Sequence, residues 1–352
     1  MNDKPRPAGQ HPLPDLDGSN ILVTGATGSF GHQFVRTVLQ RWKPRRLIIF
    51  SRDEAKQHRM ALELTGNSDH VFEKPGMPLR FFIGDVRDPE RLEMAMREVE
   101  IVIHAAALKH VPLAEYNPFE CIRTNVHGAE NVVRAALRCG VKKVIALSTD
   151  KAANPINLYG ASKLASDKIF VAANNLSGSI GTIFTVVRYG NVVGSRGSIV
   201  DVFRRLIAEG APSLPVTDVR MTRFWITVHQ GIDFVLTCLP MMRGGEIFVP
   251  KIPSMRVVDL ATAMAPDLPH RIIGIRPGEK LHEVMITEDD ARNTIELCDR
   301  YIVQPDFSFW DNGHYRSVKA EPVPDGFRYA SNTNDRWLDV AAFRRLLSEV
   351  PA

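Results

Sequence analysis

The chain has 352 residues, of which 44% are hydrophobic and 24% charged, and its formal net charge is +4. This composition is typical of a globular protein and excludes a disordered or fibrous chain. Because the basic residues form no block and no stretch reaches the ~20 apolar residues of a membrane-spanning helix, we expect neither a nucleic-acid partner nor a membrane span.

The cysteines and the N-terminal segment bear on the compartment. Cys121, Cys139, Cys238 and Cys298 are far apart and form no CxxC pair, so they predict neither a zinc site nor a disulfide framework. Residues 1–19 are polar and proline-rich, which favours a disordered tail over a signal peptide. We therefore expect a cytoplasmic protein that holds no metal.

The first predicted strand, residues 21–24, leads into a glycine-rich turn. The glycines follow the pattern Gly25-x-x-Gly28-x-x-Gly31, and an amphipathic helix continues to about residue 40. Strand, glycine turn and helix in this order are the context of a dinucleotide-binding fingerprint, in which the helix N-terminus receives the pyrophosphate. A plain glycine-rich turn is the alternative.

The second predicted strand, residues 46–50, ends in Ser51, Arg52 and Asp53. An acidic residue at this place binds the ribose 2′-hydroxyl of NAD, whereas an arginine suits the 2′-phosphate of NADP. Because Ser51 and Arg52 come first, we favour NADP, with Lys56 in support. Asp53 is alternatively the N-cap of the next helix.

Two further strands are predicted before residue 105. After a loop at 65–78, residues 80–83 lead to Asp85, which suits either a contact to the adenine edge or a plain turn. Residues 101–104 run into three alanines, whose small side chains let a cofactor lie against the backbone. This alternation of strands and helices predicts an α/β fold with a parallel, doubly wound sheet.

The stretch 144–163 offers residues for chemistry. Its β-branched strand ends in Ser148-Thr149-Asp150-Lys151, and Tyr159 and Lys163 follow on a predicted helix. Side chains at i and i+4 share a helix face, so we expect the Lys163 ammonium to lie beside the Tyr159 ring and to lower the pKa of the phenol from its usual ~10. Such a pair suits alcohol oxidation against a nicotinamide. The alternative is a chance pair on a solvated helix face.

The second half of the chain is less regular. A strand at 185–188 is followed by the polar, glycine-rich loop 189–197, which fits a ligand-lining segment, and 245–249 is predicted to return to the sheet. We predict three parts: a disordered tail at 1–19, a dinucleotide-binding domain at 20–188 plus about 245–269, and a smaller, discontinuous substrate-binding lobe at 189–244 plus 270–352.

A set of motifs together resembles the extended short-chain dehydrogenase/reductase superfamily, and within it the inverting (5-epimerising) UDP-N-acetylglucosamine 4,6-dehydratases of the pseudaminic acid pathway type. The motifs are residues 24–31, 51–54, 105–112, 147–155, 188–196, 221–225 and 276–280. Retaining relatives carry Asp-Glu after the threonine, whereas this chain has Asp150-Lys151, which marks the inverting branch. The resemblance implies a Rossmann fold, tightly held NADP, a UDP-sugar substrate and a homo-oligomer.

The resemblance also implies roles for individual residues. The expected catalytic residues are Thr149, Asp150, Lys151, Tyr159 and Lys163. The expected cofactor contacts are Gly25, Thr27, Gly28, Ser29, Phe30, Gly31, Ser51, Arg52, Asp53, Glu54, Lys56, Asp85, Val86, Ala105, Lys109, Ser148, Tyr159 and Lys163. The expected substrate contacts are Lys109, Thr149, Asn191, Val192, Val193, Gly194, Ser195, Arg196, Thr217, Arg276 and Glu279.

The expected chemistry begins at C4 of the sugar. Tyrosinate 159, held by Lys163, takes the C4 hydroxyl proton while hydride passes to the nicotinamide, and Thr149 hydrogen-bonds near C4. Lys151 removes the C5 proton, provided that burial and the cationic Lys163 lower its pKa. Asp150 gives a proton to the departing C6 hydroxyl. Hydride return to C6 and reprotonation of C5 from the opposite face give UDP-2-acetamido-2,6-dideoxy-beta-L-arabino-hex-4-ulose.

Other readings remain open at this point. Asp150 and Lys151 could form an ordinary surface ion pair worth under ~1 kcal/mol. A C5-retaining dehydratase or a nucleotide-sugar 4-epimerase would share the cofactor and the tyrosine–lysine pair, although an epimerase needs no acid and base at C5 and C6. A regulator that senses NADP without turnover is a fourth reading, and the presence of Tyr159 and Lys163 argues against it.

Overall fold

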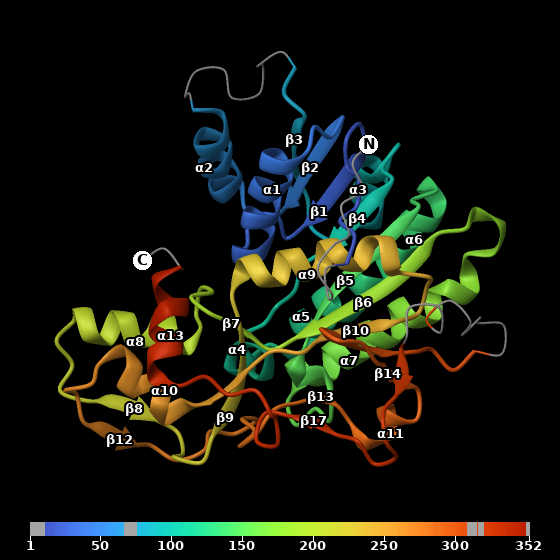
Figure 1. Cartoon of the computed structure of the whole chain (residues 1–352). Helices are drawn as coiled ribbons and strands as arrows, with labels where there is room; N and C mark the ends of the chain where they lie inside the picture. The colour runs from blue at the N-terminus through green and yellow to red at the C-terminus, as the bar shows by residue number, and fades with distance from the viewer. Residues whose placement is uncertain (1–10, 67–75, 308–314, 316–319, 350–352) are drawn as a thin grey trace, which may run out of the picture.

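A large twisted sheet runs through the middle of the molecule (Figure 1). The computed structural model describes residues 11–66, 76–307, 315 and 320–349. Within them this sheet has ten strands in the order β16-β14-β15-β10-β6-β5-β4-β1-β2-β3.

The strands from β3 to β10 run parallel. They are β3 (Leu79–Ile83), β2 (Arg46–Ser51), β1 (Asn20–Thr24), β4 (Ile101–His104), β5 (Lys143–Thr149), β6 (Ile183–Tyr189) and β10 (Ile247–Pro250). The strand order reverses between β1 and β4, and open α/β sheets bind ligands outside the carboxyl ends of their strands at such a point. The predicted parallel, doubly wound α/β sheet is confirmed.

Three antiparallel strands extend the sheet beyond β10. They are β15 (Arg300–Val303), β14 (Thr294–Glu296) and β16 (Glu321–Pro322). The sequence predicts that 270–352 belongs to the substrate-binding lobe. These strands are instead hydrogen-bonded to the large sheet, and their Ile295 and Ile302 side chains are buried in its core. The division into domains stays a prediction.

Helices cover both faces of the sheet (Figure 1). On one face α1 (Ser29–Arg41) packs against α9 (Val228–Met241), and α2 (Glu54–Thr65) contacts β2 and β3. The other face is covered by α3 (Pro89–Met96), α6 (Gly128–Cys139) and α7 (Leu158–Ala172), which is followed by short 3₁₀ turns at Ala173–Leu176 and Gly178–Ile180.

The helical segment 118–139 is not a single α-helix. It begins as α5 (Pro118–Ile122), passes through a π-helical turn at Arg123–His127, and continues as α6. The short α4 (Val111–Tyr116) precedes it. The π-helical turn carries Asn125, whose buried amide donates to the Leu108 carbonyl and to Ser162 Oγ, so this turn ties the loop after β4 to α7.

A second, smaller core lies to one side of the large sheet, around Phe203, Trp225, Met255 and Phe343 (Figure 1, lower left). Its helices are α8 (Ile199–Ala208), α10 (Val257–Met264) and α13 (Val340–Ser348). Its strands are β7 (Asn191–Val192), β8 (Leu214–Val216), β9 (Thr222–Ile226), β11 (Ser254–Arg256) and β12 (His270–Ile272). Of the remaining elements, β13 (Val284–Ile286) pairs antiparallel with β17 (Tyr329–Ala330), and α11 (Glu288–Ala291) contacts β14.

Two predicted segments fall partly outside the described residues, which omit 1–10 and 67–75. The described part of the predicted tail, 11–19, differs from a disordered segment, because Leu16 is buried in the main core and His11 Nε2 lies 2.9 Å from Asp299 Oδ1. Among the described residues, none of the helices combines the length and apolar character needed to cross a membrane.

Two helical glycines provide a test of the close packing at the start of α1. A Cβ at Gly31 would lie 2.5 Å from Ala26 Cα, whereas a Cβ at Gly231 in α9 would lie 4.0 Å from its nearest neighbour, Ile226 Cδ1. Gly31→Ala should therefore lower the free energy of unfolding by about 1–3 kcal/mol. Gly231→Ala should leave it unchanged or raise it by up to about 1 kcal/mol, because alanine favours a helix. Urea denaturation measures both, and equal midpoints would contradict the expectation.

Candidate active site

A cavity of roughly 920 Å³ opens at the carboxyl ends of β1, β4, β5 and β6 and extends to the second core. This volume lies at the upper end of the ~300–1,000 Å³ typical of ligand pockets. The sequence-predicted residues that line it are Gly25, Thr27, Gly28, Ser29, Phe30, Gly31, Ser51, Arg52, Asp53, Lys56, Asp85, Val86, Ala105, Lys109, Ser148, Thr149, Lys151, Tyr159, Lys163, Asn191, Val192, Ser195, Arg196, Thr217, Arg276 and Glu279. Four predicted residues lie outside its wall: Glu54, Asp150, Val193 and Gly194.

The glycine turn after β1 fits a dinucleotide. Gly25 has a φ of +64°, and a Cβ there would lie 2.8 Å from the backbone of Ala106, so only glycine lets the turn approach the loop after β4 this closely. Gly28 is the N-cap of α1 and has no side chain that could accept a hydrogen bond from the first amides of this helix. These amides, at the positive end of the helix dipole, are suited to a pyrophosphate.

The residues after β2 differ in what they do. Asp53 Oδ1 accepts a hydrogen bond from the Lys56 amide at 2.9 Å, so Asp53 is the N-cap of α2, as the alternative reading has it. The Arg52 side chain is 57% exposed and its guanidinium lies 3.7 Å from Asp85, so it is available at the cavity wall. The Asp85 carboxylate mainly accepts from the Arg87 guanidinium.

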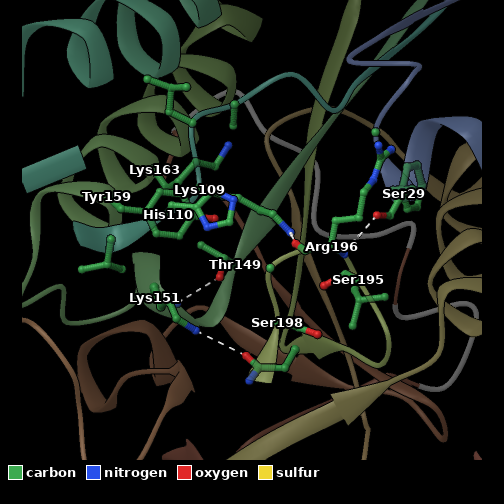
Figure 2. A pocket seen from close by; sticks show the side chains of 18 of the residues that line it. Ser29, Lys109, His110, Thr149, Lys151, Tyr159, Lys163, Ser195, Arg196 and Ser198 are labelled. Carbon is green, nitrogen blue, oxygen red and sulfur yellow. Dashed lines mark hydrogen bonds between the residues drawn. The ribbon is translucent and has the colours of Figure 1, made fainter. Parts of the chain in front are cut away.

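Tyr159 and Lys163 both reach the cavity from the first turns of α7, which Asn157 caps by accepting from the Gly160 amide (Figure 2). Lys163 Nζ donates to the Leu147 carbonyl at 2.8 Å, and burial lowers the pKa of Lys163. Burial raises the pKa of Tyr159 to about 12, although Lys151 and the Thr149 hydroxyl lower it in part. The expectation that Lys163 lowers the pKa of Tyr159 below its usual value is therefore wrong: burial outweighs the nearby cation, and that cation is Lys151.

Lys151 lies between two carboxyl groups. Its Nζ is 3.1 Å from Asp150 Oδ1 and 3.3 Å from Glu283 Oε1, and it also donates to Asn191 Oδ1 at 3.3 Å (Figure 2). Burial alone would lower the pKa of Lys151, but the two carboxylates outweigh it and raise the pKa above its usual value. The expectation of a lowered pKa is wrong because Asp150 and, after it, Glu283, a partner distant in sequence, both add negative charge beside the ammonium.

Asp150 is fully buried in the 3₁₀ turn η2 (Asp150–Ala152) that follows β5. Its Oδ1 accepts from the Thr149 hydroxyl at 2.9 Å, and its Oδ2 has no hydrogen-bond partner among the described residues. Burial raises the pKa of Asp150, which favours the neutral acid. Asp150 does not line the cavity itself. It is connected to it by its contacts with Thr149 and Lys151, both of which line the cavity.

The loop after β7 closes over the glycine turn. The Arg196 guanidinium donates to the Thr27 carbonyl at 2.6 Å, and its amide approaches Ser29 Oγ at 3.4 Å (Figure 2). Lys109 Nζ donates to the Arg196 carbonyl at 2.8 Å. The resemblance implies that Arg196 contacts the substrate, whereas its side chain here lies on the side expected to hold the cofactor.

The cavity also contains residues that sequence reasoning did not assign. Glu283, Lys280 and Tyr189 line it, together with Arg223, which the sequence marked only as a basic group. Glu283 lies three residues past the motif at 276–280, and no sequence motif includes it that would have identified it as a site residue. Chemically, the site places a phenol, two lysine side chains and a buried carboxyl group beside a dinucleotide-type turn, which suits proton transfers coupled to hydride transfer.

Comparison with known proteins places the chain among enzymes of nucleotide-sugar chemistry. The family model described as "Polysaccharide biosynthesis protein" matches residues 21–305. The UDP-N-acetylglucosamine 4,6-dehydratase (inverting) of Campylobacter jejuni subsp. jejuni serotype O:2 is 58% identical over 323 residues, which are 90% of this chain and 94% of that protein. The UDP-glucose 4-epimerase of Rickettsia akari is 40% identical over 81% of this chain and 83% of its own length.

Solved structures share the fold. The structure of Pen from Bacillus thuringiensis matches with a TM-score of 0.82 and 33% identity, over 95% of this chain and 99% of that one. DesIV, a dTDP-glucose 4,6-dehydratase from Streptomyces venezuelae solved with NAD and TYD bound, matches with a TM-score of 0.66 and 23% identity, over 85% of this chain and 98% of that one. At this lower identity the likeness concerns the fold alone.

Proposed function

The chain belongs to the polysaccharide biosynthesis protein family, and on that premise we propose that it is a UDP-N-acetylglucosamine 4,6-dehydratase that inverts C5. The observation that carries the proposal is the cluster at the end of β5, where Asp150 and Lys151 adjoin the Tyr159–Lys163 pair at a dinucleotide-type cavity. This cluster supplies an acid and an amine beside Tyr159, the group that we assign to C4 of the sugar. The 58% identical relative carries the same activity in its name.

The enzyme uses a nicotinamide cofactor, which the glycine turn and the fold support. When bound, the nicotinamide would supply the hydride acceptor for C4 and the hydride donor for C6. Our finer proposal is NADP, held through its 2′-phosphate by Arg52 with Ser51 and Lys56, since these residues line the cavity where β2 ends and Asp53 is engaged as a helix cap. Arg196 and Lys109 hold the loop that closes over this part of the cavity.

The groups at C4 are Tyr159 and Thr149. Tyr159 takes the proton of the C4 hydroxyl, and its phenol keeps its own proton until a further positive charge enters the cavity, because burial sets its pKa at about 12. Thr149 lines the same wall and donates to Asp150, so its hydroxyl connects C4 to the buried acid.

The groups at C5 and C6 are Lys151 and Asp150. Lys151 Nζ reaches the cavity wall and, once deprotonated, takes the C5 proton made acidic by the C4 ketone. Asp150 holds the proton for the departing C6 hydroxyl, because burial favours its neutral form. Since Asp150 does not touch the cavity, it delivers this proton through the Thr149 hydroxyl or the Lys151 ammonium. Addition of a proton from solvent to the opposite face of C5 inverts that carbon.

A 4-epimerase is the second candidate, because a 40% identical relative bears that name. It would use Tyr159 and the cofactor in the same way. An epimerase has no use for a buried neutral acid and an ammonium beside the phenol, however, so the Asp150–Lys151 cluster favours the dehydratase.

We further propose the setting of the enzyme. Its product serves surface-glycan biosynthesis of the pseudaminic acid type. The four free cysteines suit the reducing cytoplasm. The enzyme is a homo-oligomer in which the exposed apolar side chains of Leu113, Tyr116 and Phe119 on α4 and α5 meet a second copy, since such a patch on adjacent helices is unusual for a monomer.

Lys151→Ala tests the proposed function. Incubated with UDP-N-acetylglucosamine and a trace of NADP, the wild-type protein should form a product lighter by one water, which mass spectrometry detects. The variant should bind the cofactor normally and form product at least about 100-fold more slowly, because it lacks the group that acts at C5. Lys142→Ala, which removes an exposed lysine paired with Glu100, is the matched control and should retain activity. Normal turnover by Lys151→Ala would remove the lysine from the mechanism.

Arg52→Ala tests the preference for NADP. Because a hydrogen bond to a charged group is worth roughly 1.5–3 kcal/mol, the variant should bind NADP about 10-fold or more weakly, whereas its NAD affinity should stay the same. Fluorescence titration of both cofactors gives the two dissociation constants. Arg59→Ala, on the exposed face of α2, is the control. An equal loss for NAD and NADP would contradict the assignment.

The oligomer proposal predicts a change of mass. Wild-type protein should elute as a multiple of the chain mass in size-exclusion chromatography with light scattering, and the double variant Tyr116→Glu/Phe119→Glu should elute as a smaller species, because burying two carboxylates against a partner is costly. Leu176→Glu replaces a similarly exposed apolar side chain outside the patch and should keep the wild-type mass. A monomeric wild type would refute this proposal.

A further inference from the structure

Glu283 is a buried acid at the cavity wall, directly before β13. Its side chain is only 2% exposed, and no motif or comparison assigns it a role. We propose that Glu283 is a positioning residue that holds the Lys151 ammonium at the cavity wall and, by carrying the negative charge of that ion pair, leaves Asp150 free to remain the proton donor. This inference rests on the proposed function and assigns the charges within its cluster.

The backbone fixes Glu283 in place. Its amide donates to Ser331 Oγ at 2.9 Å, and the Ser331 amide donates back to the Glu283 carbonyl at 2.8 Å. The carboxylate therefore reaches Lys151 from a segment distant in sequence from η2, the turn after β5 that carries Asp150. Three separate segments meet at one nitrogen, because Asn191 of β7 also accepts from Lys151.

The two carboxyl groups have different surroundings. Glu283 lies 3.3 Å from Lys151 Nζ, 3.7 Å from Arg223 Nε and 3.7 Å from Lys280 Nζ. Asp150 is fully buried, and Lys151 is the cation that forms an ion pair with it. Arg223 and Lys280 are themselves fixed, since they donate to backbone carbonyls of Thr222, Leu281, Lys280 and Ala153.

A single ammonium group cannot stabilise the negative charges of two neighbouring carboxylates equally. The acid with fewer cations beside it therefore keeps its proton. Burial by itself raises the pKa of both acids. Lys151, Arg223 and Lys280 together outweigh it for Glu283 and lower the pKa of that residue. The pKa of Asp150 is raised by burial and further by the charge of Glu283. The cluster thus rests as a neutral Asp150, a Lys151 ammonium and a Glu283 carboxylate. Without Glu283, the only carboxylate left to pair with Lys151 would be Asp150.

The pH dependence follows from the groups that face Lys151. The charged and titratable ones are Asp150 beside it, Glu283 before β13, Arg223 on β9, Tyr159 on α7, and the more distant Lys280 and Lys109. Activity rises with pH as the Asp150–Lys151 pair loses its first proton, which gives access to the form with one neutral acid and one neutral amine, and it falls as the pair loses its second proton. The negative charge of Glu283 raises both pKa values, so its removal lowers both.

Glu283→Gln therefore should move the whole pH profile of kcat to lower pH, by about one unit or more, since a charge at this distance shifts a pKa by roughly 1–3 units. Glu283→Asp keeps the charge but withdraws it by one methylene and should give a smaller shift in the same direction. Asp289→Asn removes an equal charge from the exposed surface of α11 and should give none. A uniform loss of rate with an unshifted profile would reduce Glu283 to a structural residue and overturn the proposal.

A second measurement needs no turnover and separates this inference from the proposed function. The infrared band of a protonated carboxyl group should be present in the wild-type protein at neutral pH and absent in Asp150→Asn and in Glu283→Gln, where Asp150 becomes the carboxylate that pairs with Lys151. Asp289→Asn should keep the band. If the band is unchanged in Glu283→Gln, the charge assignment is wrong even in an active enzyme. If the wild type forms no product but the band behaves as expected, the proposed function fails and the charge assignment stands.

Discussion

The account depends on the ammonium of Lys151 held between Asp150 and Glu283 at the carboxyl end of β5. This nitrogen is where the large sheet, the strand β7 and the segment before β13 come together. Asp150 is fully buried with Lys151 as its ion-pair partner, whereas Arg223 and Lys280 also approach Glu283, so we propose that Asp150 is the acid that stays neutral. A neutral acid and an amine side by side are what the elimination of water from a sugar ketone requires, and in the proposed mechanism they lie beside Tyr159, the phenol assigned to C4.

Burial also shifts the pKa values of the other titratable groups near the site. It holds Tyr159 in its protonated form, lowers the pKa of Lys163 and leaves His104, at the end of the central strand β4, neutral with a pKa of about 3. We infer that the loop held by Arg196 and Lys109 closes the cavity over the glycine turn and keeps water from these groups.

Local sequence signals were sufficient for much of the fold. The glycine spacing at 25–31 and the β-branched runs of the parallel strands predicted the sheet, because turn conformation and burial are determined by neighbouring residues. The same holds for Asp53, for which helix capping was one of two open readings. The charge state of Lys151 could not be predicted, since it depends on Asp150 and also on Glu283, which comes from a segment distant in sequence and has no local pattern. The antiparallel strands β14 and β15 were missed for a related reason: their pairing with β10 is a long-range contact without a local pattern.

The most direct test of C5 inversion is proton NMR of the purified protein with UDP-N-acetylglucosamine and trace NADP in heavy water. Deprotonation of C5 and reprotonation from the opposite face predict a 6-deoxy-4-keto product with deuterium at C5 and ring couplings of the L-arabino configuration. A 6-deoxy product with an unchanged C5 centre would contradict the inversion, and a substrate that stays intact in the presence of bound cofactor would contradict the dehydratase itself.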